Sequence, residues 1–289
     1  MDQEKNNNLK GILFLLLAAL GFSLMAFFVR ISGDLPTMQK AFFRNIVALF
    51  IASGALIKNK TEFNIPKRNY IDIFLRSFCG TVGLVTNFYA IDRLGIADAN
   101  MLNKLSPFFA IIMSIFILKE IPSRFDIACT ITAFIGAIFI IRPTGANTQI
   151  FPALMGLLGG LGAGMGYTFV RKLGKSGVKA PIIVFAFSLF SSIVTLPFFL
   201  INYVPMTPLQ WVYLLLAGVF ASLGQFSITT AYKYAPAKEI SVFVYTQVIF
   251  AALLGFIFFS EVPVVLSIIG YVIIIGVAVI RWRHDLSKE

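Results

Sequence analysis

The sequence predicts an all-α polytopic membrane protein with ten transmembrane helices arranged as two inverted five-helix repeats. Two observations carry this prediction. The first is composition: the 289 residues are 58% hydrophobic and only 13% charged, with a mean hydropathy of +0.87, whereas a soluble domain is about 25% charged. The second is internal similarity, because residues 1–142 align with residues 142–283 at one constant offset of 141 positions.

Ten runs of about 20 apolar residues follow one another, each long enough to cross a hydrocarbon core about 30 Å thick. The first five are 9–30, 36–57, 70–91, 98–118 and 125–141, and the second five are 151–172, 180–201, 209–232, 239–259 and 264–282. The connections are short, so no soluble domain is expected between them. The first run is too long for a signal peptide and lacks a small-residue cleavage site, so we expect it to be retained.

Matching residues recur at the offset of 141. The matched stretches are Phe28-Val29-Arg30 with Phe169-Val170-Arg171, Phe109-Ala110 with Phe250-Ala251, and Glu120-Ile121-Pro122 with Glu261-Val262-Pro263. The matched small residues are Gly21, Gly83, Ala90 and Ala137 with Gly162, Gly224, Ala231 and Ala278. Five crossings are an odd number, so the second copy enters the bilayer from the opposite side, as in secondary transporters. We expect the first repeat to span 1–146 and the second 147–289.

The formal net charge of +11 is attributed to membrane topology rather than to nucleic-acid binding, because basic residues beside hydrophobic spans set orientation. With a cytoplasmic N-terminus, most lysines and arginines of the connections and tails fall on the cytoplasmic side. The other side receives only Arg30, Arg93 and Arg142. We therefore expect a multi-pass protein of the cell (inner or plasma) membrane with both termini in the cytoplasm.

No cofactor, metal site or enzymatic activity is expected. Cys79 and Cys129 lie in apolar runs on non-adjacent segments, which suits packing residues. The glycine-rich stretch 156–166 lacks the dinucleotide-binding spacing, and Gly174-Lys175-Ser176 lacks the earlier glycine of a phosphate-binding loop. His284 is the only histidine, and no carboxylate pair or catalytic set of serine, histidine and aspartate falls within the spans.

One stretch resembles a known family. Residues 90–99 read AIDRLGIADA and are followed by Leu105-Ser106-Pro107-Phe108-Phe109 and Glu120, which resembles the fourth-helix signature of EamA-domain proteins of the drug/metabolite transporter superfamily. The second copy repeats it at 231–237, then at Tyr245, Ala251 and Glu261, and Arg44 stands where the family commonly has an arginine. The chain departs from the family at Gln247-Val248, where a proline is common. The resemblance implies a ten-helix exporter or exchanger of small metabolites, with its cavity between the halves, and it names no substrate.

All charged residues near the middle of the spans are cations. Arg44 lies about 4 Å from the centre of its helix, and Arg76 and Lys104 lie within about 7 Å. A charge at such a position costs roughly 2.5 to 3.5 kcal/mol, so each is a functional candidate. All 13 aspartates and glutamates fall at segment ends, in loops or in tails. This asymmetry indicates an anionic or zwitterionic solute, such as an amino acid or an organic acid.

Helical spacing groups polar residues and glycines into one face on each of four spans, which we expect to line the cavity. These faces are Arg76, Gly80, Gly83 and Asn87 on the third span, Asn100, Asn103 and Pro107 on the fourth, Ser222, Gln225 and Thr229 on the eighth, and Ser241, Tyr245 and Gln247 on the ninth. Pro107 frees a backbone carbonyl, and Gly156, Gly160 and Gly164 form a stripe that permits close helix packing. The predicted substrate-binding residues are Arg76, Asn87, Asn103, Lys104, Tyr167, Gln225, Tyr245 and Gln247. The predicted structural or gating residues are Arg44, Gly80, Gly83, Pro107, Gly160 and Gly164.

Alternatives remain open at this stage. Arg44 could bond interhelical carbonyls, Arg76 could extend to the cytoplasmic headgroups, and Lys104 could reach the outer interface, where Lys40 is also expected. The 15% aromatic content favours an exporter of lipophilic cations. The basic side chains Arg76 and Lys104 within the spans argue against it, because they would repel a cationic solute. A non-transporting scaffold or an enzyme acting on lipid headgroups is a third possibility.

We expect alternating access by exchange or uniport, or with protons handled by end-lying acids such as Asp98 and Glu239. The expected partners are a small-molecule solute and membrane lipid, with no nucleic acid, and the expected state is a monomer or a homodimer.

Overall fold

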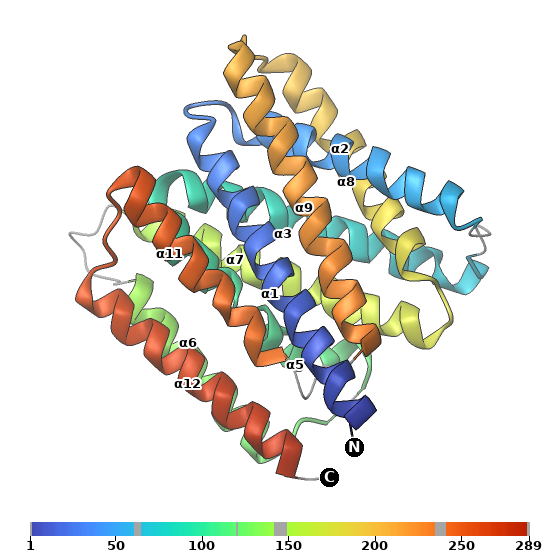
Figure 1. The fold of residues 1–289 in the computed structure, drawn as a ribbon, viewed down its shortest axis with the longest axis vertical. Coiled ribbons are helices and arrows are strands. Elements are labelled where there is room, and N and C mark those ends of the chain that lie inside the picture. Colours follow the sequence, from blue (N-terminus) through green and yellow to red (C-terminus); the bar gives the residue numbers. More distant parts are fainter. Residues whose placement is uncertain (1, 61–64, 120, 142–148, 235–240, 288–289) are drawn as a thin grey trace.

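The computed structural model describes residues 2–60, 65–119, 121–141, 149–234 and 241–287, and these form helices joined by short connections (Figure 1). The helices of the first half are α1 (Asp2–Ile31), α2 (Thr37–Lys58), η1 (Lys67–Asn69), α3 (Tyr70–Leu94), α4 (Ile96–Asn103), α5 (Ser106–Ile117) and α6 (Arg124–Ile141). Those of the second half are α7 (Ile150–Lys175), α8 (Ala180–Ile201), α9 (Pro208–Tyr234), η2 (Ser241–Tyr245), α11 (Thr246–Phe259) and α12 (Val265–Ser287).

These helices confirm the predicted ten-span fold. Eight described spans are long and apolar enough to cross a membrane, counting α4 and α5 as one span of residues Ile96–Ile117. The ninth span is the shorter apolar stretch Phe243–Phe259, and α3, whose buried face carries Arg76 and Asn87, is the tenth. The chain begins and ends at the same end of the bundle (Figure 1), as an even number of crossings requires.

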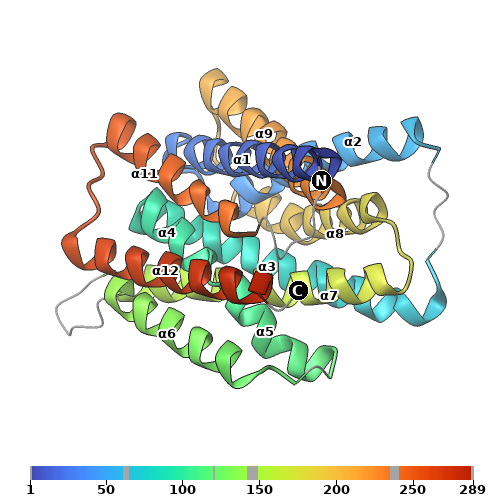
Figure 2. The ribbon, with the colours of Figure 1, turned by 60° about the horizontal axis from the view of Figure 1, so that its bottom comes forward.

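The two halves pack around a pseudo-twofold axis. The most extensive helix interfaces are α1 with α9 and α3 with α7, and the offset of 141 converts the first pair into the second. Two further interfaces, α2 with α8 and α6 with α12, each join a helix to its own counterpart, and the contact of α4 with α11 joins the fourth span to the ninth. Figure 2 shows α12 alongside α6 at one side of the bundle.

Glycines at equivalent positions allow the two main interfaces to close. A Cβ added to Gly21 would lie 2.9 Å from the backbone nitrogen of Gly224, and one added to Gly162 would lie 2.7 Å from Cα of Gly83. Each pair is the other pair displaced by the repeat. Because the neighbouring atoms belong to backbone, a side chain at these positions would force the helices apart.

Backbone breaks also recur at equivalent positions. The fourth span is interrupted between α4 and α5, and the ninth begins with the 3₁₀ turn η2 before α11 starts at Thr246. Lys119 and Ser260, which follow the ends of α5 and α11, are 141 residues apart and both adopt the left-handed region, with φ of 57° and 54°. The ninth span is therefore broken although Gln247-Val248 replaces the family's proline.

Ion pairs tie the helices together near both ends of the bundle. Lys40 Nζ lies 2.6 Å from Asp92 Oδ1, and Lys172 Nζ lies 2.8 Å from Asp72 Oδ1. The Lys40 side chain is 1% exposed. Its burial is tolerated because Asp92 neutralises it. Glu120, Arg142, Glu239 and the expected boundary at 146/147 lie outside the described residues.

Candidate functional site

A small cavity of about 130 Å³ lies between the two halves. Helices of both repeats line it, including α1, α3, α7 and α9 from the two main interfaces. It contains most of the residues predicted from sequence: Arg44, Arg76, Gly80, Gly83, Asn87, Asn103, Lys104, Tyr167, Gln225 and Gln247. Four predicted residues lie outside the lining, namely Pro107, Gly160, Gly164 and Tyr245. We call this space the central cavity.

The two arginines of the central cavity meet at one aromatic ring. The guanidinium carbon of Arg76 lies 4.5 Å from the ring centre of Phe187, and that of Arg44 lies 5.8 Å from it. Both side chains are 7–8% exposed. Within the described part of the chain, Arg76 makes no hydrogen bond or ion pair, and its Nε is buried without a partner. Packing and the ring contact therefore hold its guanidinium, whose hydrogen-bond donors have no acceptor among the described residues.

Arg44 is partly satisfied. Its Nη1 donates to Asn45 Oδ1 at 2.7 Å, and Asn45 in turn donates to Ser191 Oγ of α8 at 2.7 Å. The Nε of Arg44 is buried without a hydrogen-bond acceptor among the described residues. The amide of Asn45 thus orients this guanidinium, whereas the interhelical carbonyls considered from sequence do not.

Lys104 lies at the break between α4 and α5. In a continuous helix its carbonyl would accept from the amide of Phe108, but that amide donates to Leu105 at 2.9 Å. The freed Lys104 carbonyl instead accepts from the Tyr245 hydroxyl at 3.2 Å. The Lys104 side chain is 8% exposed, and no described residue pairs with its ammonium group. Tyr245 therefore supports the wall of the cavity from behind.

Amide side chains complete the lining. Gln247 Nε2 donates to Asn100 Oδ1 at 2.6 Å, and Asn100 Nδ2 donates to the Ile96 carbonyl at 2.8 Å. The Oδ1 of Asn87 is buried and has no donor among the described residues. Within this described lining there is no aspartate or glutamate. The cavity combines fixed positive charge with amide groups of both polarities.

The predicted glycines bring the walls close together. A Cβ on Gly160 would lie 2.7 Å from the Leu102 carbonyl oxygen, and one on Gly164 would lie 2.7 Å from that of Ser106. These two glycines therefore seat α7 against the broken fourth span. On α3, Gly83 contacts the backbone of α7, while Gly80 leaves room for Arg76 and Phe187.

A vestibule lies toward each end of the bundle. The termini-side vestibule, of about 370 Å³, includes Arg171, Ser114 and Pro122. The opposite vestibule, of about 420 Å³, includes Arg30, Gly255 and Pro263, which are the equivalents of those three residues in the other repeat. Tyr167 lines both the termini-side vestibule and the central cavity.

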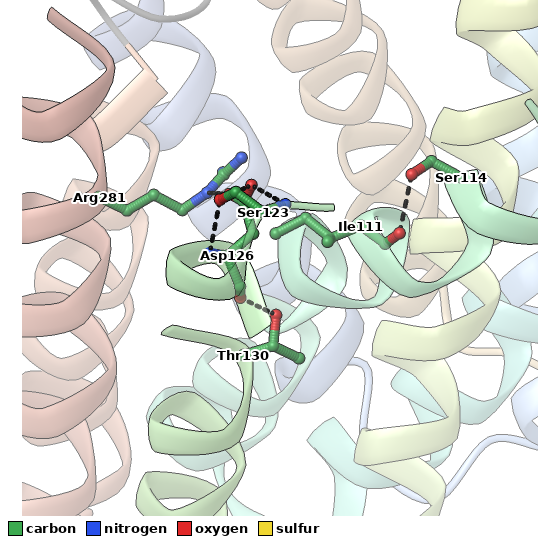
Figure 3. Close-up of polar contacts among 6 residues, drawn as sticks. All are labelled: Ile111, Ser114, Ser123, Asp126, Thr130 and Arg281. Atoms are coloured by element: carbon green, nitrogen blue, oxygen red, sulfur yellow. Dashed lines mark hydrogen bonds and ion pairs between the residues drawn. The ribbon is translucent and has the colours of Figure 1, made fainter. Parts of the chain in front are cut away.

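The termini-side vestibule has a polar wall (Figure 3). Asp126 accepts from the Ser123 hydroxyl at 2.8 Å and from Arg281 Nε at 3.0 Å, which joins α6 to α12. The Ser114 hydroxyl donates to the Ile111 carbonyl at 2.8 Å and stays within α5.

Acidic residues line part of the opposite vestibule. Glu261 Oε2 accepts from the Ile96 amide at 2.9 Å, and its Oε1 lies 3.2 Å from Arg30 Nη2. Asp98, in the first turn of α4, accepts from the Tyr271 hydroxyl at 2.5 Å and from Ser267 at 3.2 Å. Glu261 thereby links the start of α4 to α1, and Asp98 links it to α12 of the second repeat.

Sequence reasoning missed several lining residues. Phe187, Phe22 and Met25 line the central cavity, but each belongs to a span in which most residues are apolar, so no periodic signal separates the cavity face from the lipid face. Asn100 was expected on the same face as Asn103, and it does line the cavity. Among the other polar residues of that prediction, Ser222 lies outside the lining, and the side chains of Thr229 and Ser241 lie outside the described part.

The chain belongs to the EamA-like transporter family, whose model matches residues 9–142 and again residues 150–282. The two matches begin at the offset of the repeat, as the duplicated halves require. Family membership makes this protein a multi-pass membrane transporter of a small-molecule solute rather than an enzyme.

Individual relatives cover nearly the whole chain. "Pseudopaline exporter CntI" of Pseudomonas aeruginosa is 31% identical over 92% of this chain and 93% of its own length. "Solute carrier family 35 member G1" of Homo sapiens is 28% identical over 95% of this chain and 80% of its own. One solved crystal structure has a TM-score of 0.66 over 94% of this chain and 96% of its own at 15% identity, which shows the fold alone.

Proposed function

We propose that this protein is a secondary transporter of a small anionic or zwitterionic organic solute, which it moves by alternating access. The observation that carries this proposal is the charge of the central cavity. Arg44, Arg76 and Lys104 line it, and no carboxylate does so among the described residues. A charge inside a membrane protein is costly unless it is compensated, so a solute carrying negative charge is the natural partner of these groups.

The same observation disfavours an exporter of lipophilic cations. Such a cargo would use the aromatic faces of the cavity, but both guanidinium groups already lie over Phe187. A cationic solute would add to the positive charge with no acidic group in the described lining to offset it. An organic acid or an amino acid gains an attraction there instead.

The relatives support this assignment. Among them, the Pseudomonas aeruginosa protein is named as an exporter, and we propose export or exchange for this chain too. The direct contacts of the solute would come from the predicted substrate-binding residues that line the cavity, above all Arg76 and Lys104. Tyr245 would act through the Lys104 carbonyl.

The two vestibules support alternating access. They occupy equivalent positions in halves that we place at 1–146 and 147–289, and they lie toward opposite ends of the bundle. Rocking of the halves about the central cavity would expose it to each vestibule in turn. Tyr167 would separate the cavity from the termini-side vestibule, which it also lines.

We further propose a cell-membrane protein, monomeric or homodimeric, with both termini in the cytoplasm. The distribution of basic residues supports this orientation, because the side that carries the termini also receives most of the flanking lysines and arginines. Labelling of single cysteines placed at Lys58 and Lys175 should find both on the cytoplasmic side.

Counterflow in proteoliposomes tests the proposed function. Purified protein should exchange labelled organic acids or amino acids across the membrane, and Arg76→Gln should lower this exchange at least about tenfold, because a hydrogen bond to a charged group contributes roughly 1.5 to 3 kcal/mol. Arg68→Gln, a matched change in the exposed turn η1, should leave it unaltered. Exchange of quaternary amines but of no acid would identify a cation exporter, and no flux of any solute would identify a scaffold.

A further inference from the structure

The central cavity carries more positive charge than a zwitterion can balance. Three cations line it, and the described lining supplies no acidic partner for any of them. A zwitterionic solute brings no net charge and a monocarboxylate brings a single negative charge. Each buried charge left unbalanced costs several kcal/mol, so a solute with two acidic groups fits this cavity better than either.

The Arg76 guanidinium and the Lys104 backbone lie at two different levels along the cavity. The Arg76 guanidinium lies beside Gly166 of α7, 3.5 Å from where a Cβ on that glycine would stand. The Lys104 backbone lies between the levels of Gly160, which faces the Asn103 carbonyl, and Gly164, which faces that of Ser106. This level is about four residues before Gly166, which is roughly 6 Å along the helix axis.

Different chemistry surrounds the two places. At the arginine end, Phe187 fixes the guanidinium of Arg76, and the buried Nε atoms of Arg44 and Arg76 lack described acceptors. Planar guanidinium groups bind carboxylates through paired hydrogen bonds. At the lysine end, the hydrogen bond from Tyr245 fixes the Lys104 backbone. The Lys104 side chain carries one ammonium charge. The two ends therefore offer one binding position each for a carboxylate.

We propose, as a refinement that rests on the proposed function, that the solute is an organic acid with two separate acidic groups of the dicarboxylate type. One carboxylate binds at Arg44 and Arg76 and the other at Lys104. The amides of Asn87, Asn100 and Gln247 also line the cavity, so they are available to contact the solute. The amide content indicates that the solute bears polar substituents besides its two acidic groups.

The test measures binding to purified full-length protein by isothermal titration. The probes are malonate, succinate, glutarate and adipate, the monoamide of each, and the corresponding ω-amino acids. The monoamide keeps the size of the diacid and removes one negative charge. We expect a diacid to bind most tightly and its monoamide to bind at least about tenfold more weakly, the loss of one charge-assisted hydrogen bond.

The variant Lys104→Gln assigns the second carboxylate. In this variant the preference for the diacid over its monoamide should fall to about twofold or less, because the ammonium partner is gone. Lys58→Gln, at the exposed end of α2, should keep the full preference. Thermal melting of both variants confirms folding, and binding of the monoamide to Lys104→Gln shows that its site is intact.

Each other outcome is decisive. A monoamide or an ω-amino acid that binds as tightly as every diacid would overturn the two-carboxylate proposal and leave the proposed function standing. A diacid preference that survives Lys104→Gln would overturn the role of Lys104. If no probe binds, the dicarboxylate class is overturned, and counterflow of other organic acids and amino acids then decides the proposed function separately.

Discussion

Tyr245 donates its hydroxyl hydrogen bond to the backbone carbonyl of Lys104, at 3.2 Å and 141 residues away. The two residues are equivalent positions of the two repeats, so the axis that relates the halves passes near this bond. It also passes beside the central cavity, because Lys104 lines it. The breaks in the fourth and ninth spans therefore lie opposite each other, with different side chains at equivalent positions. Lys104 lines the cavity, and Tyr245 supports the Lys104 backbone.

Removing this hydroxyl should destabilise the protein. Tyr245→Phe leaves the buried Lys104 carbonyl without a donor, which costs about 1 to 3 kcal/mol. Unfolding in a denaturing detergent should show the loss directly. Tyr203→Phe removes a hydroxyl from a half-exposed side chain and serves as the control. Equal stability of the two variants would show that the Tyr245 contact contributes nothing.

Two glycines of α7 should respond in opposite ways to alanine. In Gly162→Ala the new Cβ would meet the Cys79 carbonyl at 2.7 Å and the backbone of Gly83, so we expect a loss of about 1 to 3 kcal/mol from overpacking. Gly174 has no neighbour within 4 Å of such a Cβ, so Gly174→Ala should be neutral or gain up to about 1 kcal/mol from helix propensity. Melting temperatures of the two variants measure the difference, and similar losses in both would contradict the close α3–α7 contact.

The carboxylate of Glu261 should contribute to the stability of the protein mainly as a hydrogen-bond acceptor. Its Oε2 accepts the first free amide of α4 at Ile96, and Arg30 adds an ion pair that is partly exposed. Glu261→Gln keeps an acceptor and should lose less than about 1 kcal/mol, since exposed ion pairs contribute little. Glu261→Ala loses both contacts and should lose about 1 to 2 kcal/mol more. Chemical unfolding of the three proteins ranks them, and a glutamine variant as unstable as the alanine variant would mean that charge dominates.

Transport should not depend on a pH gradient. The described lining of the central cavity holds no carboxylate to carry a proton, and Asp98 is held by Tyr271 and Ser267 beside the opposite vestibule. We expect equal exchange rates with and without an imposed gradient in proteoliposomes. Flux that is driven by the gradient and abolished in Asp98→Asn would instead make Asp98 the coupling acid.

The fold could be predicted from the sequence because the ten apolar runs fix the number of spans and the offset of 141 fixes how the two halves correspond. The helical face of Arg76, Gly83 and Asn87 could be predicted as well, since polar residues in an apolar span are few and their spacing is decisive. The break before Thr246 could not, because no proline marks it and the tertiary contact of Tyr245 stabilises it instead.

The contribution of apolar residues to the site could not be predicted either. Phe187 is one of several phenylalanines on α8, and only packing distinguishes the ring that contacts two arginines from those that face lipid. Asp98 was expected at a segment end, and it is there, but its burial against α12 depends on how the second repeat packs. Individual side-chain contacts across the halves are a property of tertiary structure that local patterns do not encode.

The most direct test of the central claim is access to the cavity from both sides of the membrane. Ala163 lines the central cavity on α7, and Ala163→Cys, with Cys79 and Cys129 replaced by alanine, places one small reactive group there. We expect a membrane-impermeant anionic thiol reagent to label it from either side of oriented proteoliposomes, and a bound organic acid to protect it. Labelling from neither side, or from one side only whatever solute is present, would contradict an alternating cationic cavity between the two halves.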